Sequence, residues 1–242
     1  MNVRFAVFVS VLGVLSGGPG AFASAMPSLF QTIAHRGASG YAPEHTAVAT
    51  AMAHAMGAEF IEQDVVFTRD GRALVLHDTT LETTTNVADV YPDRAREDGR
   101  FYAIDFTTDE LRRLRKGERR NPVTGQAVYP DRYPVDGPGF PLMFLDEAVA
   151  LIRALDEAAG RRTGLYPELK RPEFHLAEGF DPVPPFMETL RQSGAFAEGA
   201  PPCYIQCFHD GTLKRIRREY GPDRILIQLI GHNHWGEGST DF

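Results

Sequence analysis

The sequence predicts an α/β protein built on a parallel sheet, and three observations support this fold class. Short apolar segments alternate with helical patterns along most of the 242 residues. The composition is that of a globular protein, with 43% hydrophobic and 24% charged residues. Most of the apolar segments end in a polar or ionisable residue, which is typical of sheets that carry a site at the carboxyl ends of their strands.

The alternation predicts six core strands and four main helices. The strands are expected at residues 32–34, 60–67, 72–76, 163–169, 203–208 and 224–230. The helices are expected at residues 46–56, 145–159, 186–193 and 210–220. Strands that alternate with helices form βαβ units, and these units build a parallel sheet. A tight turn at residues 69–71 joins the second and third strands.

Residues 82–141 interrupt this alternation. The segment is rich in Pro, Gly, Asp, Arg and Tyr, and one short helix is expected at residues 108–114. Thr107 or Thr108 would cap that helix, with Glu110 near its start. An irregular segment of this length inside a compact domain is usually functional. We interpret it as an insertion that covers one face of the core.

The N-terminus has the features of a secretory signal peptide. A basic residue, Arg4, precedes an apolar run, and small residues follow at the positions that a signal peptidase requires. The run is shorter than the ~20 residues of a spanning helix, so a stable membrane anchor is not expected. We predict a signal peptide at residues 1–25, a barrel-type domain at residues 30–242, and a periplasmic location.

Cys203 and Cys207 lie four residues apart in a predicted strand. At ~3.3 Å per residue they are ~13 Å apart, whereas a disulfide needs Cα atoms within ~7 Å. We therefore expect two free, buried thiols. The net charge of −7 gives no general attraction for nucleic acid, so an anionic substrate would need local cations. The sequence predicts no oligomeric state.

The polar residues at the strand ends suggest a cation site. They are His35, Arg36, Glu62, Asp64, His77, Glu168, Lys170 and Gln206. Glu62 and Asp64 are two apart in an apolar strand, so both point to one face and repel unless a cation is bound. With Glu168 they form an all-oxygen set, which suits Ca²⁺ or Mg²⁺ rather than Zn²⁺. Lone histidines at strand ends are often structural, and Lys170 could simply pair with Glu168.

Five short motifs, in order, resemble the glycerophosphodiester phosphodiesterases. They are HRGASGYAPEHT at residues 35–46, EQD at 62–64, LHD at 76–78, YPELK at 166–170 and QCF at 206–208. The segment DRAREDGRFYAIDF at residues 93–106 is similar to the insertion of the periplasmic bacterial branch. The resemblance runs from about residue 33 to about residue 231.

The resemblance implies a (β/α)₈ TIM barrel with an inserted subdomain and assigns roles to the strand-end residues. It implies two further strands, for which we find no residues, so a barrel truncated after the sixth strand is expected. The implied acid and base are His35 and His77, and Arg36 and Lys170 would contact the phosphate. Glu62, Asp64 and Glu168 would hold the divalent cation, most often Ca²⁺. Glu44 is either a further site residue or a helix N-terminal residue.

The activity implied by the resemblance is hydrolysis of a glycerophosphodiester, a small-molecule substrate, to sn-glycerol 3-phosphate and an alcohol. The substrate's own 2-hydroxyl would attack phosphorus, and water would then open the cyclic phosphate. A sphingomyelinase-D-like phosphodiesterase on the same fold is a rival hypothesis, which the segment at residues 93–106 disfavours. The sequence also leaves open an exported binding protein that keeps the fold, and an inactive, truncated fragment.

Overall fold

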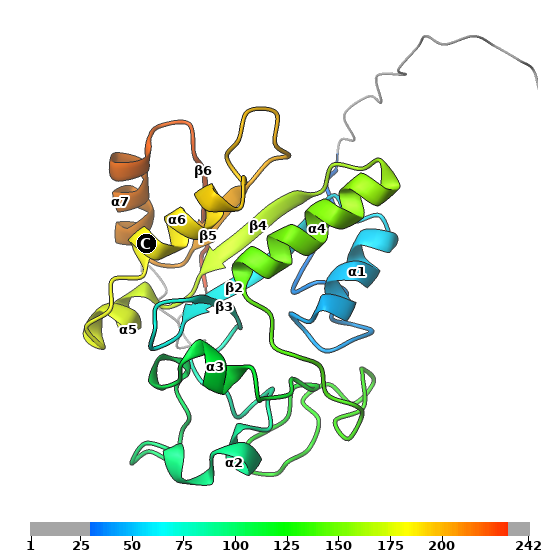
Figure 1. Cartoon of the computed structure of the whole chain (residues 1–242), viewed down its shortest axis with the longest axis vertical. Helices are drawn as coiled ribbons and strands as arrows, with labels where there is room; N and C mark the ends of the chain where they lie inside the picture. The colour runs from blue at the N-terminus through cyan, green and yellow to red at the C-terminus, as the bar shows by residue number, and fades with distance from the viewer. Residues whose placement is uncertain (1–29, 232–242) are drawn as a thin grey trace, which may run out of the picture. The chain divides into compact units, whose positions relative to one another are not determined.

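The computed structural model describes residues 30–231, so the predicted signal peptide at residues 1–25 lies outside the described residues. The strands are β1 (Ile33–Ala34), β2 (Phe60–Phe67), β3 (Ala73–Val75), β4 (Gly164–Leu169), β5 (Tyr204–Cys207) and β6 (Ile225–Gln228). The longer helices are α1 (Ala47–Ala55), α4 (Leu145–Ala159), α6 (Val183–Gln192) and α7 (Asp210–Tyr220). Figure 1 shows α4 in front of the sheet, running alongside β4.

Five of the six strands run parallel in the order β1-β2-β4-β5-β6. This arrangement confirms the predicted α/β class with a parallel sheet, and six strands are present among residues 30–231, as expected. The longest pairing joins β2 to β4, with Phe60 opposite Gly164 and Asp64 opposite Glu168. A Cβ on Gly164 would meet the ring of Phe60 at 2.3 Å, so this pairing depends on glycine there.

The third strand corrects the expectation of an all-parallel sheet. β3 pairs with β2 antiparallel, with Val75 opposite Val65 and Ala73 opposite Phe67. Only residues 68–72 join the two strands, whereas a parallel pair needs a crossover of a dozen residues or more. The Thr68 N–H donates to the Arg72 carbonyl at 3.1 Å and closes the turn. The chain therefore runs back along β2, and His77, which follows β3, lies beside the middle of β2.

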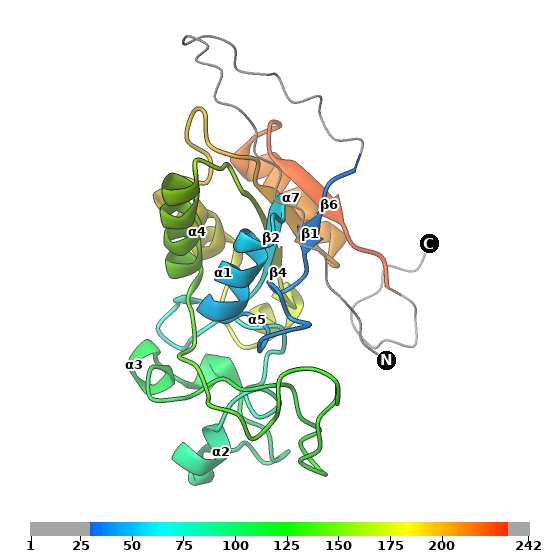
Figure 2. The same cartoon turned by 90° about the vertical axis from the view of Figure 1, so that its right-hand side faces the viewer.

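A large apolar cluster packs the helices onto the sheet. Ile61 and Val65 of β2 share it with Ile152 of α4, Phe186 of α6 and Ile216 of α7. Figure 2 shows α1 and α4 on the same side of β2. Both cysteines are free, as predicted, but only Cys207 is buried in this cluster, whereas Cys203 is partly buried against it. Burial raises the pKa of each thiol to about 12.

Local signals explain where the helices begin and end. The Thr46 hydroxyl accepts from the Ala49 N–H at the start of α1, and α4 ends at Gly160, whose φ of 61° is left-handed. α6 begins at Val183, three residues earlier than predicted, because Pro184 and Pro185 are tolerated in a first helical turn. A short helix, α5 (Pro172–Ala177), is not predicted by the sequence pattern.

Residues 82–141, the segment interpreted as an insertion, pack around a second apolar cluster that they share with β2, β3 and the segments flanking them. The segment contains α2 (Val87–Val90), α3 (Thr108–Leu111) and the 3₁₀ turns η1 (Pro92–Arg94) and η2 (Ala103–Asp105). Thr107 and Glu110 form a capping box at α3, as predicted, but the helix ends at Leu111 rather than at residue 114. Phe106, Leu111 and Leu114 pack with Leu76 and Phe144 in the second cluster. Figure 1 shows this segment below the sheet.

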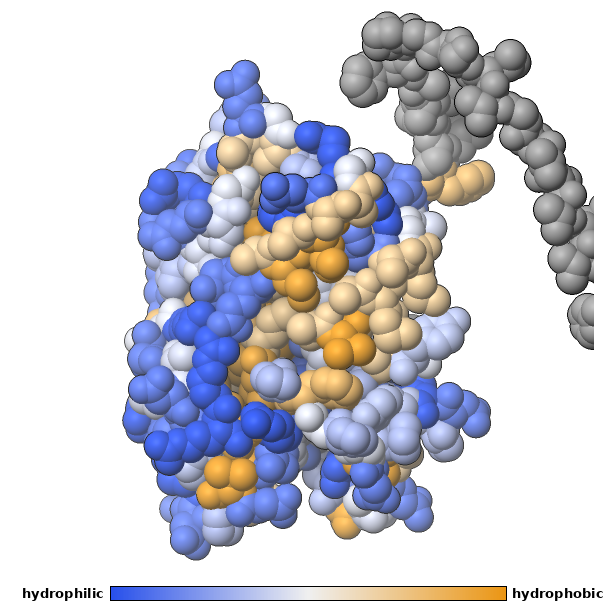
Figure 3. All heavy atoms as spheres, turned by 45° about the vertical axis from the view of Figure 1, so that its right-hand side comes forward, coloured by the Kyte–Doolittle hydropathy of each residue, from blue (hydrophilic) through white to orange (hydrophobic). Residues whose placement is uncertain are grey.

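The surface of α1 differs from that of the other long helices. Its inner side buries Ala49 and Ala53, and apolar side chains also lie outside, with Val48 at 39% and Met56 at its C-terminal end at 60% exposure. Figure 3 shows a central area of apolar side chains surrounded by hydrophilic ones on one face of the described residues. No helix among residues 30–231 is long and apolar enough to cross a membrane.

Candidate active site

Strand register brings three acidic side chains together in the interior. Glu62 and Asp64 alternate onto one face of β2, and Asp64 lies opposite Glu168 of β4. Glu168 in turn lies opposite Gln206 of β5. The exposed fractions of Glu62, Asp64 and Glu168 are 3%, 1% and 6%. The sequence prediction that these carboxyl groups share one site is therefore supported by the backbone pairing itself.

The three carboxyl groups differ in how readily they ionise. Burial, together with the charge of Asp64, raises the pKa of Glu62 well above its usual range. The same two causes raise the pKa of Glu168 to about 8. Burial acts against ionisation of Asp64 as well, but a hydrogen bond and charge from His45 outweigh it and lower its pKa. Ionisation of Glu62 and Glu168 is therefore disfavoured, and a bound hard cation would relieve this cost.

His45 is a candidate cation ligand that the sequence analysis missed. One ligand atom from each of His45, Glu62 and Asp64 lies within 4.8 Å of the others, and all three residues are buried. Two of these three match the predicted set, while Glu168 is on the next strand and its Oε1 lies 3.0 Å from the Lys170 ammonium. The oxygen-rich donors suit a divalent cation. The motif at residues 35–46 contains His45, but its pattern points only to Glu44 at that place.

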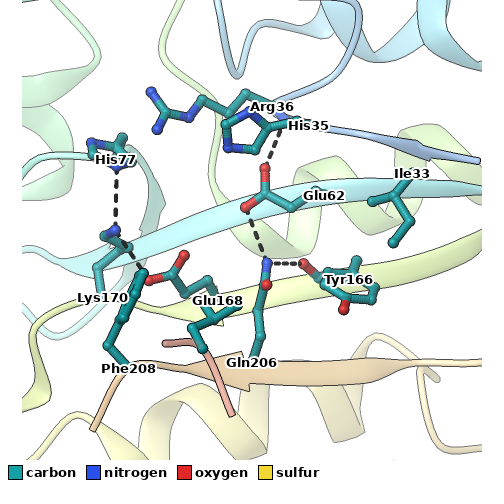
Figure 4. Close-up of a pocket in the computed structure, with 11 residues that line it drawn as sticks. Ile33, His35, Arg36, Glu62, His77, Tyr166, Glu168, Lys170, Gln206 and Phe208 are labelled. Carbon is teal, nitrogen blue, oxygen red and sulfur yellow. Dashed lines mark hydrogen bonds and ion pairs between the residues drawn. The ribbon is translucent and has the colours of Figure 1, made fainter. Parts of the chain in front are cut away.

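A cavity of about 490 Å³ opens beside this cluster and collects most of the predicted residues (Figure 4). It is lined by Ile33, His35, Arg36, Glu62, His77, Tyr166, Glu168, Lys170, Gln206, Phe208 and Leu229. Asp64 is the one predicted site residue that does not line it, because His45 and Arg36 cover its carboxylate. The wall combines charged groups with apolar and aromatic side chains, and the Lys170 ammonium lies 5.6 Å from the centre of the Phe208 ring.

Arg36 lies at the first turn after β1 and contacts the acidic cluster. Its backbone N–H donates to Glu62 at 2.7 Å, and its guanidinium lies 3.3 Å from Asp64 and 3.1 Å from Glu44. Arg36 adopts a left-handed φ of 60°. The next residue, Gly37, has a φ of 76°, and a Cβ there would meet the backbone of α1 at 2.8 Å. A left-handed φ and this close contact both require glycine at position 37.

The two predicted catalytic histidines both face the cavity. Burial and the charge of Arg36 lower the pKa of His35. The His77 Nδ1–H donates to Asp78 at 2.6 Å, which leaves Nε2 as the acceptor that faces Lys170 at 3.3 Å. An Nε2 lone pair held in this way can accept a proton from a hydroxyl and return it to a leaving group.

Three more charged residues surround the site, and two of them come from the insertion. Glu44 is 2% exposed and accepts hydrogen bonds from both Arg36 and Arg119. Lys116 is fully buried, and burial lowers its pKa to about 8. The structure favours the site role for Glu44 over the helix N-terminal role. Neither Arg119 nor Lys116 falls in a motif that sequence reasoning singled out.

The chain belongs to the glycerophosphoryl diester phosphodiesterase family, whose model matches residues 35–235. It is 39% identical over 211 residues to a glycerophosphodiester phosphodiesterase of Haemophilus influenzae, covering 85% of this chain and 58% of that protein. It is also 39% identical over 206 residues to that of Treponema pallidum, covering 82% and 56%. The chain thus spans under two thirds of the length of these relatives.

Solved structures of the same fold are consistent with this membership. A glycerophosphoryl diester phosphodiesterase from Silicibacter pomeroyi DSS-3 superposes with a TM-score of 0.65 at 24% identity, covering 89% of this chain and 70% of that one. A phosphodiesterase from Oleispira antarctica, in complex with the product sn-glycerol-3-phosphate, gives 0.57 at 26% identity, covering 82% and 65%. The family match confirms the predicted glycerophosphodiester phosphodiesterase family, and these structures confirm the predicted barrel-type fold.

Proposed function

We propose that this chain hydrolyses glycerophosphodiesters to sn-glycerol 3-phosphate and an alcohol, with the help of a divalent cation. The observation that carries the proposal is the convergence of buried carboxyl groups, two histidines and two cationic side chains on one cavity. Relatives with about 39% identity are named for this activity. A phosphodiester anion needs both positive charge and proton transfer to be cleaved, and this cavity offers both.

The cation proposed here is Ca²⁺, with Mg²⁺ as the second choice. Glu62 and Asp64 would hold it, joined by Glu168 or His45, because these donors lie closest together. When bound, such an ion neutralises phosphoryl charge and lowers the pKa of a coordinated hydroxyl. Burial and the charge of Asp64 raise the pKa values of Glu62 and Glu168, and this supports the assignment because a bound cation stabilises the ionised carboxylates against both effects.

The proposed proton transfers use His35 and His77. The His77 Nε2 lone pair is oriented by Asp78 and accepts a proton from the attacking hydroxyl or returns it to the leaving alcohol. His35, with a lowered pKa, is available as the partner base or acid. Arg36 and Lys170 donate to the phosphoryl oxygens. The substrate's own 2-hydroxyl is the proposed nucleophile.

The decisive experiment assays glycerophosphocholine hydrolysis by the purified chain after chelation and after Ca²⁺ or Mg²⁺ is added back. We expect activity only with a cation, and none on sphingomyelin or on a 2-deoxy glycerol analogue. His35→Ala and His77→Ala should abolish turnover while Ca²⁺ still raises the Tm. Full activity in chelated protein would refute cation dependence, and preference for sphingomyelin would favour the sphingomyelinase-D-like hypothesis.

We also propose that the chain is exported to the periplasm through residues 1–25. The proposal rests on the basic, apolar and small-residue pattern of this segment. Expression with a C-terminal tag, followed by cell fractionation and intact-mass measurement, tests it. Recovery of uncleaved protein from the cytoplasm alone would contradict it.

A further inference from the structure

One arginine of the insertion joins two parts of the site that lie far apart in sequence. The Arg119 guanidinium donates from Nη2 and Nε to the Glu44 carboxylate at 2.7 and 3.2 Å. Its third nitrogen, Nη1, donates to Asp78 at 2.6 Å. One side chain thus holds two carboxylates that come from different segments of the sheet region.

Each carboxylate has a second bond, which leads to a residue of the cavity wall. Glu44 Oε2 also accepts from Arg36 Nη1 at 3.1 Å, and Asp78 Oδ1 accepts from His77 Nδ1 at 2.6 Å. The five side chains form an unbroken sequence of charged hydrogen bonds, Arg36–Glu44–Arg119–Asp78–His77. Charge-assisted bonds are shorter and stronger than neutral ones and fix orientation as well as distance.

The backbone around Arg119 is held firmly in place. The Arg120 N–H donates to the Thr83 carbonyl at 2.9 Å, and the Gly117 N–H donates to the Thr84 carbonyl at 2.8 Å. The Thr83 hydroxyl also donates to Asp78 at 2.7 Å, so the same segment holds the carboxylate from a second direction. Because its base is fixed, the guanidinium can impose its position on Glu44 and Asp78.

The burial of this network argues for a role beyond surface stability. The side chain of Arg119 is 12% exposed and that of Glu44 is 2% exposed. Hydrogen bonds to His77 and Arg119 keep the pKa of Asp78 far below its usual range despite its burial. Without Arg119, the only guanidinium bound to Glu44 would be that of Arg36. Asp78 would still accept a hydrogen bond from His77 at Oδ1, but no guanidinium would bind its Oδ2.

We propose that Arg119 is a positioning residue through which the insertion completes the active site, setting Arg36 by way of Glu44 and His77 by way of Asp78. The inference rests on the proposed phosphodiesterase function. It assigns residues 82–141 a specific role in catalysis beyond covering the sheet.

The test compares Arg119→Gln, Arg119→Lys and the control Arg120→Gln with the unaltered chain. Arg120 is the next residue, but its side chain donates to the Val135 carbonyl and takes no part in the network. We expect Arg119→Gln to lower kcat about 10- to 100-fold, the usual size of a positioning defect, with a smaller change in KM. Arg119→Lys should recover part of kcat, and Arg120→Gln should match the unaltered chain.

A double-variant cycle with Asp78→Asn separates positioning from a general loss of structure. If Arg119 acts through Asp78, the fold-loss of kcat in the double variant should be smaller than the product of the fold-losses in the two single variants. Assays run well below the Tm of each variant exclude unfolding as the cause. Equal kcat in Arg119→Gln and the unaltered chain, or losses that multiply fully, would overturn the inference.

A readout without substrate keeps this inference distinct from the proposed function. The His77 Nδ1–H in its bond to Asp78 gives a low-field imidazole proton signal in ¹⁵N-labelled protein. We expect this signal to shift or broaden in Arg119→Gln and to persist in Arg120→Gln. An inactive unaltered chain would refute the proposed function alone, whereas an unchanged His77 signal in Arg119→Gln would refute the positioning role.

Discussion

The parallel sheet and the insertion at residues 82–141 place side chains by different physical means. In the sheet, backbone hydrogen bonds between β2 and β4 set Asp64 opposite Glu168. In the insertion the helices span no more than four residues, and its strand pairing is limited to isolated bridges such as Thr85 with Lys116. Side-chain hydrogen bonds and an apolar cluster shared with β2 and β3 hold that segment instead.

This difference teaches how the two halves of the site are built. The strand register sets the positions of Asp64 and Glu168 independently of the neighbouring side chains, because strand pairing is formed by backbone hydrogen bonds. Arg119 reaches Glu44 and Asp78 only because the insertion folds over the sheet with a defined geometry. Substitutions that disrupt the sheet should therefore destabilise the whole domain, whereas substitutions in the insertion should affect mainly residues 82–141.

The largest expected effects come from emptying either apolar cluster. Phe67 lies in the cluster that packs the helices onto the sheet, Phe106 lies in the cluster that the insertion shares with the sheet, and both are fully buried. Substitution of either by Ala should lower the free energy of unfolding by about 3–5 kcal/mol. Native-state hydrogen exchange should show lost protection throughout the chain for Phe67→Ala, and mainly in residues 82–141 for Phe106→Ala. An equally wide loss of hydrogen-exchange protection in both variants would contradict this difference between the two regions.

Two substitutions on β2 should have clearly different effects on the stability of the metal-free protein. Asp64→Asn removes the carboxylate partner of His45 and Arg36 and should cost about 3 kcal/mol. Glu62→Gln should cost little or stabilise the fold, because burial and Asp64 already disfavour the Glu62 charge and raise its pKa. Urea unfolding in chelator measures both. Both variants should also lose stabilisation by Ca²⁺, and retained stabilisation would contradict the ligand assignment.

The pH dependence of stability should differ in sign between the two regions. In the metal-free protein the pKa of Glu168 is raised to about 8, so the native state keeps a proton that the unfolded state has lost. Stability therefore falls as pH rises from about 4.5 to 8, by up to about 1.4 kcal/mol per pH unit. Glu168→Gln should flatten this slope.

Glu110 of the insertion is the counterpart. Its backbone bond from Thr107 and its bond from Arg94 lower its pKa to about 2. Its contribution is present above pH 4.5 and is lost as the pH falls towards 2, and it is small because the side chain is partly exposed and screened by solvent. Unfolding curves of Glu110→Gln and Glu168→Gln across pH 3–9 check both signs. Slopes of the same sign would contradict the comparison.

The smallest effect should come from Arg96, which ties the insertion to the residue that follows α5. Its guanidinium bonds Asp105 at 2.7 Å and Glu178 at 2.8 Å, and it lies over the Tyr102 ring. Because the side chain is about one third exposed, Arg96→Gln should cost at most about 1 kcal/mol. Limited proteolysis should cleave residues 82–141 faster in this variant while urea unfolding of the sheet changes little. Unchanged proteolysis would show that the apolar contacts suffice.

Much of the sheet and its acidic site could be predicted from local patterns. The two-residue spacing of Glu62 and Asp64 places both on one face of a strand, and this holds in any sheet. The predicted direction of β3 is wrong. A polar residue that follows an apolar segment marks the end of a strand, but it does not show whether that strand runs parallel or antiparallel to its neighbour. The five-residue link at 68–72 is the signal that indicates an antiparallel return.

The sequence by itself determined the family, the α/β class, and the set of reactive side chains at the strand ends, because these depend on residue type and short spacings. Only the tertiary structure decided that His45 covers Asp64 and that Arg119 links Glu44 to Asp78. These contacts join residues 19, 75 and 41 positions apart in the chain. No local pattern encodes such pairs, since they exist only after the sheet and the insertion have packed together.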